Sequence, residues 1–366
     1  MPTPSHGQTA GNHTRGRNVL IRDAGGRPGK GRTAVAGREG KPGTRWPRRF
    51  RRTPEGGRPR GRLLAGLGAA TAALLALHRF VPNTPGRLGS LLETLLFWLG
   101  PLTALLLLCA AARRARTALL VLLVPALVWA AAFGPRLLPE GPPGPRELTV
   151  VQHNVADDNA DPVGTARALT DSGADLIALQ ELVDPALTVY RRELAPRYPY
   201  HAVRGTVGLW SRHPLGATRA LDVRPGDLTE PWQRALRAEV RTPYGEVAAY
   251  VVHLPSVRLG PGGLASARRD ESAARLGRLL ASEPARRVIL AGDLNGTVED
   301  RGLAPLTSRL GAPARGLALS YPAALPVARI DQVLARGGHV PAIRALPATG
   351  SDHLPVLARV ALDPAA

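Results

Sequence analysis

Side chains with carboxylate, amide and imidazole groups recur where β-rich runs end between residues 147 and 366. They are, in chain order, Asn154, Glu181, His253, Asp293, Asn295, Asp331, Asp352 and His353. Singly, each has an ordinary structural explanation, because a strand-end Asn usually forms a turn and an isolated His is usually a hydrogen-bonded structural residue. As a set, they offer oxygen ligands for a hard divalent cation and groups that transfer protons. The set therefore predicts a site that combines a bound cation with proton transfer.

Other catalytic mechanisms lack their sequence signatures in this chain. The sequence holds no G-x-S-x-G elbow for acyl transfer, no G-x-x-x-x-G-K-[ST] loop for nucleotide phosphates and no H-E-x-x-H helix for zinc. Cys109 is the only cysteine, which excludes an intramolecular disulfide framework and a zinc site made mainly of thiolates. A Ser-His-Asp triad stays open at this point, because such a triad is recognised by geometry.

Alternating β-rich and helical patterns must position these side chains. The expected helices cover Pro162–Ser172, Pro185–Leu194 and Ala267–Ala281. The expected strands are Leu148–His153, Leu176–Gln180, Val207–Ser211, Leu236–Val240, Val247–His253, Arg287–Ala291, Gln332–Leu334 and Val356–Leu362. Many strands with a few interleaved helices predict a layered α/β or α+β domain over 147–366. A stiff Pro/Gly linker at 140–146 separates that domain from the residues before it.

The order of these motifs resembles the endonuclease/exonuclease/phosphatase superfamily. The matching segments are Gln152–Val155, Leu179–Glu181, Gly208–Pro214, Val252-His253, Gly292–Asn295, Arg329–Val333 and Ser351–His353. They span essentially all of 147–366, and Gly-Asp-Leu-Asn with Ser-Asp-His is specific at this separation. The resemblance implies a four-layered α/β sandwich, as in pancreatic-type DNase, and a Mg²⁺-dependent hydrolase of phosphate esters or anhydrides, with Mn²⁺ as the alternative cation.

The resemblance also implies which residues bind the cation and the phosphate. Glu181 would be the principal Mg²⁺ ligand, with Asn154 near the metal and the phosphate. Asp352 would contact the metal region. Asn295 would hydrogen-bond the phosphoryl oxygens as charge develops on them. Such fixed donors suit phosphoryl transfer, which needs mainly positioning and charge stabilisation.

The resemblance assigns the proton-transfer roles to the remaining acid and imidazole groups. Asp293 would orient or deprotonate the attacking water. His353 would be a general base or a phosphate-stabilising imidazole, oriented by Asp331, since a His–Asp pair fixes the tautomer of the imidazole. His253 would bind substrate near the leaving group. DNase-like members pair this second histidine with an additional Glu, and the sequence offers only Asp222, Asp227 and Glu230 as candidates for it.

The charge of the chain is concentrated at its beginning. Of a formal net charge of +20, residues 1–62 carry +13 and residues 147–366 only +2. The last part therefore offers no long basic stripe that neutralises many phosphates, which makes nucleic acid the second choice of partner. Residues 1–61 are rich in Gly, Arg and Pro, and we expect them to form a disordered basic tail in the cytoplasm. A tether to anionic lipid or nucleic acid is the alternative for this tail.

Three apolar stretches predict a membrane anchor over residues 62–139. They are Leu63–Leu77, Thr94–Ala112 and Thr117–Pro135, and the last two approach the ~20 residues that cross a bilayer as a helix. A cleaved signal peptide is the rival interpretation of the first stretch. The tail and the basic Arg113–Arg116 turn should both face the cytoplasm. Three spans then give a multi-pass protein of the cell membrane whose residues after Pro135 lie outside the cytoplasm.

This layout resembles the VanJ-like membrane proteins of the teicoplanin-resistance type from high-GC Gram-positive bacteria. The resemblance implies a phosphatase that acts on a lipid-linked phosphate or pyrophosphate at the outer membrane face, with a possible role in antibiotic resistance. A tethered enzyme meets membrane substrates at high effective concentration, which favours a lipid. Two alternatives stay open: an outward-facing nuclease or other phosphodiesterase, and a catalytically silent, membrane-anchored binding module.

Overall fold

The computed structural model describes residues 61–84 and 86–364. The tail expected over residues 1–61 lies outside the described residues, apart from Gly61. The N-terminal helices are α1 (Arg62–Leu77), η1 (His78–Phe80), α2 (Leu88–Thr94), η2 (Leu96–Trp98), α3 (Leu99–Ala112), α4 (Arg116–Phe133) and η3 (Gly134–Leu137). The later helices are α5 (Pro162–Asp171), α6 (Ala186–Leu194), α7 (Ala267–Ala281), η4 (Arg301–Leu303) and α8 (Ala304–Thr307).

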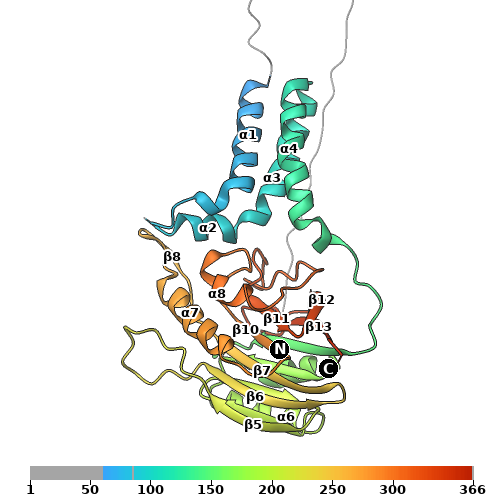
Figure 1. Ribbon diagram of the computed structural model, residues 1–366, viewed down its shortest axis with the longest axis vertical. Helices are drawn as coiled ribbons and strands as arrows, with labels where there is room; N and C mark the ends of the chain where they lie inside the picture. Colours follow the sequence, from blue (N-terminus) through green and yellow to red (C-terminus); the bar gives the residue numbers. More distant parts are fainter. Residues whose placement is uncertain (1–60, 85, 365–366) are drawn as a thin grey trace, which may run out of the picture. The chain divides into compact units, whose positions relative to one another are not determined.

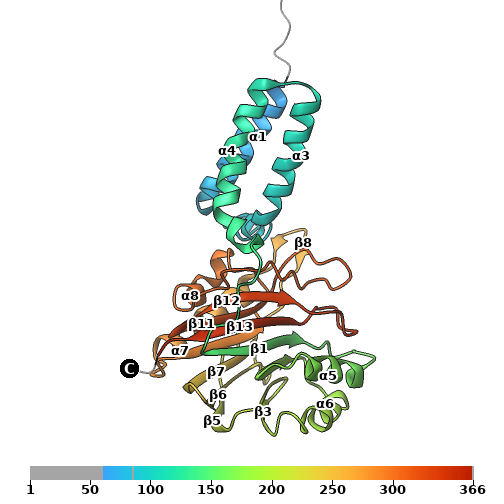
Figure 2. The same ribbon diagram turned by 90° about the vertical axis from the view of Figure 1, so that its right-hand side faces the viewer.

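The N-terminal helices α1, α3 and α4 run side by side as a bundle (Figures 1 and 2). Two helices are long and apolar enough to cross a membrane, over Arg62–Phe80 and Arg116–Leu137. A third span exists only if α2 and the following Leu96–Ala112, which are bent by 59° at Leu95, count as one. Several leucines on α1, α3 and α4 are exposed, among them Leu63, Leu108 and Leu127. Exposed leucines of this kind suit contact with lipid.

The strands after the linker form two large sheets and a small hairpin. The six-stranded sheet has the order β12-β13-β1-β2-β4-β3, the five-stranded sheet β11-β10-β7-β6-β5, and the hairpin β8-β9. The strand bounds are β1 (Glu147–Asn154), β2 (Leu176–Gln180), β3 (Tyr200–Arg204), β4 (Val207–Ser211), β5 (Leu215–Ala220), β6 (Ala235–Thr242), β7 (Gly245–His253), β8 (Leu259–Gly260), β9 (Gly263–Leu264), β10 (Val288–Asp293), β11 (Asp331–Arg336), β12 (Gly338–Ala345) and β13 (Val356–Leu362).

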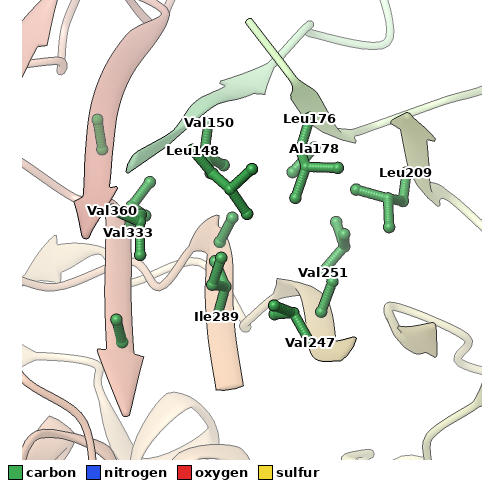
Figure 3. Close-up of a cluster of buried hydrophobic side chains, with 14 of the residues drawn as sticks. Leu148, Val150, Leu176, Ala178, Leu209, Val247, Val251, Ile289, Val333 and Val360 are labelled. Carbon is green, nitrogen blue, oxygen red and sulfur yellow. The ribbon is translucent and has the colours of Figure 1, made fainter. Parts of the chain in front are cut away.

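Three apolar clusters stack these elements into four layers. The largest lies between the two sheets and includes Leu148, Ile289 and Val333 (Figure 3). A second cluster packs α7 and α8 on the outer face of the five-stranded sheet, and a third packs α5 and α6 on the outer face of the six-stranded sheet. The order helix, sheet, sheet, helix confirms the predicted α/β sandwich.

Local sequence signals explain where these elements begin and how they face. Helix α5 starts at Pro162, whose fixed φ suits the first helical position, while the side chain of Asp161 accepts a hydrogen bond from Gly164 N. Along β1, Leu148 and Val150 face the core between the sheets and Val151 faces the outer layer. This alternation has a period of two, as a strand requires.

The predicted helices and the eight predicted strands match the structure within a few residues, whereas five strands were not predicted. Two of them, β8 and β9, are only two residues long, and the other three, β3, β5 and β12, are edge strands of the large sheets. An edge strand has one unpaired side and carries a weaker apolar pattern: β5 is largely exposed, and β12 contains Pro341 and an irregular register between His339 and Ala342. The short helix α2 was not predicted, because it falls in the segment between the apolar stretches Leu63–Leu77 and Thr94–Ala112, which we expected to be a loop.

Candidate active site

The register of three neighbouring strands brings His253, Asp293 and Asp331 together. Asp293 at the end of β10 pairs with His253 of β7 on one side and with Asp331 of β11 on the other. All three continue the row of alternate residues that faces the core between the sheets, so they close one end of that core. Gly292 permits the close packing of β10 on β7, because a Cβ at this position would lie 2.0 Å from the carbonyl oxygen of Val252.

The parallel pair β1 and β2 supplies Asn154 and Glu181 from the opposite sheet. Asn154 ends β1, and Glu181 follows β2 in the left-handed conformation with φ of 60°. The Asn154 amide donates to Glu181 Oε1 at 3.0 Å and across the sandwich to Asp293 Oδ2 at 3.2 Å. The backbone N–H of Asp157 donates to Glu181 Oε2 at 3.2 Å. Glu181 is thus fixed at both oxygens yet stays 30% exposed toward solvent.

His353 and Asp331 form a buried hydrogen-bonded pair. His353 Nδ1 lies 2.8 Å from Asp331 Oδ2, and the amide of Gln152 donates to the other oxygen of Asp331 at 2.8 Å. Burial alone would lower the pKa of His353, but the charges of Asp331 and Asp293 raise it to about 9. The pKa of Asp331 is held below its ordinary value by His353, against the opposing effect of burial. His353 Nε2 is left facing Asp293 Oδ2 at 3.8 Å.

Asp293 lies between these groups and is itself fully enclosed. Burial and then the charge of Asp331 raise the pKa of Asp293 well above its ordinary value, although His353 opposes that shift. Backbone and side-chain N–H groups of Asn295 donate to its two oxygens at 2.9 and 3.2 Å. A carboxylate with a raised pKa in a cleft is a candidate for proton transfer.

His253 contacts a guanidinium instead of the acid found in DNase-like members. Arg234 Nη1 lies 3.5 Å from His253 Nδ1, while Asp227, one of the candidate acids, pairs with Arg268. Burial first, and then the charge of Arg234, lower the pKa of His253 to about 3. Within residues 61–84 and 86–364, the buried His253 Nε2 has no hydrogen-bond partner; it lies 3.6 Å from Asp293 Oδ2 and 3.8 Å from Glu181 Oε1. This nitrogen is therefore the candidate atom for the contact with substrate that was predicted for His253.

These groups line one cleft of about 360 Å³. The lining includes Asn154, Glu181, Asp293, Asn295, Asp352 and His353, together with Thr94 of α2 and Tyr321. Asp352 stands at its exposed mouth, with a side chain 62% exposed and Oδ1 4.0 Å from His353 Nε2. The structure thus brings all eight predicted residues to one place, with Asp331 and His253 enclosed behind the lining. The roles predicted for them stay predictions.

The donor set fits a hard divalent cation on the Glu181 side of the cleft. Glu181 presents a carboxylate that is 30% exposed and has remaining lone pairs, which suits a hard cation. The Asn154 amide lies beside it, with its NH2 group donating to Glu181 and its oxygen accepting from Ala156 N, so Asn154 would bind the cation only after that oxygen turns toward Glu181. The group Asp293, Asp331 and His353 also brings ligand atoms within 4.8 Å of one another. However, Asp331 and His353 already use their facing atoms on each other and Asp331 lies at the bottom of the site. That group is better suited to proton transfer, so Glu181 with Asn154 is the better cation site.

Several residues of the site were not assigned roles from the sequence. The Gln152 amide donates to Asp331 across the two sheets. Ser351 holds the loop before β13 against the end of β1 by donating to Asn154 O at 2.7 Å and accepting from His353 N at 3.0 Å. Tyr321 packs its ring 4.9 Å from the His353 ring. The alternation of side chains along β1 is the sequence signal that could have identified Gln152, because Gln152 lies on the same face of the strand as Asn154. His153 lies on the opposite face, where its Nε2 contacts the Thr349 hydroxyl.

Comparison with known proteins identifies a family for this part of the chain. The model of the Endonuclease/Exonuclease/phosphatase family matches residues 151–353. No curated protein sequence gives a significant match. Among solved structures, an endonuclease/exonuclease/phosphatase from Beutenbergia cavernae DSM 12333 is 20% identical, with a TM-score of 0.47 over 60% of this chain and 72% of that one. Sphingomyelinase C from Streptomyces griseocarneus is 19% identical, with a TM-score of 0.45 over 59% of this chain and 99% of that one.

Proposed function

Because the chain belongs to the endonuclease/exonuclease/phosphatase family, whose members are phosphoesterase hydrolases that generally use a divalent metal, we propose that it dephosphorylates a lipid-linked phosphate or pyrophosphate. The protein would be anchored in the cell membrane by its apolar helices, with its N-terminus in the cytoplasm and its active site outside. Mg²⁺ is the proposed cation and Mn²⁺ the alternative.

The observation that carries this proposal is that one wall of the cleft is formed by a residue next to the apolar helices. Thr94 ends α2, directly before the apolar segment Leu96–Ala112, and lines the cleft together with Asp293 and His353. A phosphate that reaches these residues therefore lies next to the apolar helices. Exposed apolar side chains follow Tyr321 in the same loop, namely Leu325 and Val327. Such side chains suit contact with lipid better than with a nucleic-acid backbone.

The site residues provide the steps of hydrolysis. Asp293 would accept a proton from the attacking water, as its raised pKa favours. The imidazolium of His353, held by Asp331, and the amide of Asn295 would stabilise charge on the phosphoryl oxygens. A divalent cation on Glu181 and Asn154 supplies, when bound, further charge withdrawal from the phosphate and a lowered pKa for a coordinated water.

The leaving-group side of the site favours a departing phosphate. Arg234 contacts His253 and lines an adjoining cleft of about 710 Å³ with Trp232, Arg258 and Arg268. Arg258 and Ser256 line both clefts, so the two are neighbours. A guanidinium keeps its charge at any working pH and stabilises a departing anion. The P–O bond of a pyrophosphate would break with its electron pair on an oxygen of the departing phosphate, which needs no proton from His253.

The runner-up is a nucleic-acid phosphodiesterase, and the same adjoining cleft is what favours it. Trp232 lies under Arg234, with the guanidinium carbon 5.4 Å from the ring centroid. An aromatic ring with nearby arginines can stack a base and bind a phosphate. The substrate assay below separates the two candidates.

The test compares substrates on the full-length protein in phospholipid vesicles with Mg²⁺. We expect phosphate release from a polyprenyl pyrophosphate and no cleavage of plasmid DNA, with EDTA abolishing the activity. Arg234→Ala should slow pyrophosphate hydrolysis by about tenfold to hundredfold, whereas Arg219→Ala, an exposed arginine on β5, should leave it unchanged. DNA cleavage without phosphate release from the lipid would exclude the proposal in favour of the runner-up.

A further inference from the structure

The segment Gly86–Thr94, called the connector below, precedes the apolar residues of α3 and contains α2. Its Glu93 carries a carboxylate that is only 1% exposed. A charge removed from water is stable only where opposite charges and hydrogen bonds compensate it. The partners of Glu93 therefore define where the connector must lie.

Arg301 of the catalytic domain compensates Glu93. Its side chain donates to Glu93 from Nε at 3.0 Å and from Nη2 at 2.9 Å, and its backbone N–H donates at 2.8 Å. The same guanidinium donates to the carbonyl oxygens of Val81 and His78 at 2.9 Å. A planar guanidinium with four hydrogen bonds of this kind fixes the position of the carboxylate as well as compensating its charge.

The other end of the connector binds the domain at a second point. Arg87 Nη1 lies 2.6 Å from Asp270 Oδ2, near the start of α7. The carbonyl oxygen of Gly86 accepts from Leu264 N at 2.9 Å. The connector is thus held at both ends, by Asp270 and by Arg301.

Arg269, whose side chain is fully enclosed, binds both Asp270 and Asp300 and so joins the two anchoring points. Arg269 donates from Nε to Asp270 Oδ1 at 2.7 Å and from Nη2 to Asp300 Oδ2 at 2.5 Å, and Asp300 is the neighbour of Arg301. Its third nitrogen, Nη1, donates to the carbonyl oxygen of Asn295 at 3.0 Å. Asn295 has a positive φ of 49°, which a non-glycine residue holds only where its surroundings fix it.

We propose that the connector is a positioning element of the active site, which fixes the Asn295 loop through Arg301, Asp270 and Arg269. Glu93 acts through Arg301 and its chain neighbour Asp300, and Arg87 acts through Asp270; both routes meet at Arg269, and neither Glu93 nor Arg87 touches substrate. Catalysis is then coupled to the seating of the connector on the catalytic domain. The inference rests on the proposed hydrolase function but not on the identity of the lipid.

The test measures kcat and KM of the full-length protein on a soluble ester, bis(p-nitrophenyl) phosphate, so that access to lipid plays no part. Glu93→Ala should lower kcat by about tenfold to hundredfold with little change in KM. Glu93→Gln, which still accepts hydrogen bonds from Arg301, should recover part of that loss. Arg87→Ala should lower kcat by a smaller factor, since Arg87 is one-third exposed. The matched control is Arg136→Ala, which removes the ion pair to Glu299 without touching Arg269 and should leave kcat unchanged.

A double-mutant cycle separates positioning from general loss of structure. In an Asn295→Ala background, Glu93→Ala should lower kcat no further, because the residue on which it acts is gone. Additive effects, or a wild-type kcat in Glu93→Ala, would overturn the inference. A failure of the proposed lipid substrate looks different: the wild type would hydrolyse the soluble ester but no lipid phosphate.

Discussion

Two buried networks of acids and bases in this protein have opposite characters. In the first, Glu283 receives Arg237 Nε at 2.7 Å, Arg237 Nη2 at 3.0 Å, the Tyr250 hydroxyl at 2.5 Å and the N–H of Ala285 at 3.0 Å. Every oxygen of that carboxylate has two donors. In the second, the candidate catalytic cluster, Asp293 lies beside the like charge of Asp331, and His253 Nε2 has no hydrogen-bond partner among the described residues.

The pKa shifts follow this difference. Burial alone would raise the pKa of Glu283, but the hydrogen bonds from Arg237 and Tyr250 lower it to about 2. At Asp293, burial and a neighbouring carboxylate both act upward, so its pKa is raised. A fully satisfied network stabilises the fold, whereas a cluster with like charges and an unpaired donor retains groups that can bind and exchange protons. The comparison predicts that removing a member of each network has opposite consequences.

Asp293→Asn should give the largest effect, on activity alone. We expect kcat to fall by about 10³-fold, because the variant cannot accept the proton of water. The midpoint of thermal unfolding should stay level or rise, since a buried charge next to Asp331 is removed. The measurement is phosphate release alongside a thermal unfolding curve, with Asp171→Asn, an exposed acid at the end of α5, as the control. Retained activity would show that proton transfer does not depend on Asp293.

The catalytic cluster could be predicted from sequence because its residues lie at the ends of strongly patterned strands. Asp293, His253 and Asp331 extend apolar rows whose alternation is readable along the chain, and their order matches a family pattern. The pairing of β10 with β7 and β11 then brings them together. The edge strands β3, β5 and β12 were not predicted, because much of each is exposed or irregular and burial does not select a clear alternation.

The partners of individual charges could not be predicted in the same way. Arg234 replaces the expected acid at His253, and nothing near Arg234 in the sequence indicates this contact. Glu93 bonds to Arg301, although 208 positions separate the two. Ion pairs of this kind carry no periodicity, and only the folded backbone decides which of many arginines meets a given acid.

Glu283→Ala should give the second largest effect, on stability alone. The change leaves Arg237 and Tyr250 without their main acceptor in a buried site, at a cost of about 3 kcal/mol in the free energy of unfolding. The folded fraction should keep its wild-type kcat. Chemical denaturation gives the first quantity and active-site-normalised turnover the second. Glu246→Ala is the control, since the exposed Arg241–Glu246 pair on the same sheet should contribute under about 1 kcal/mol.

The smallest effect expected is the acid dependence of the Glu283 network. The pKa of Glu283 is about 2 in the folded protein and 4.5 for an unperturbed Glu, so its stabilisation is fully present above about pH 4.5. It is lost as the pH falls toward 2, because the unfolded chain then binds a proton that the folded state excludes. Between pH 4.5 and 3 the group should contribute about 1–2 kcal/mol to the decline in stability. Glu283→Gln should remove that part of the dependence of the free energy of unfolding on pH. An unchanged dependence would assign the acid sensitivity to other carboxylates. Asp293 cannot supply it, because a pKa that is raised in the folded protein stabilises the folded state as the pH falls.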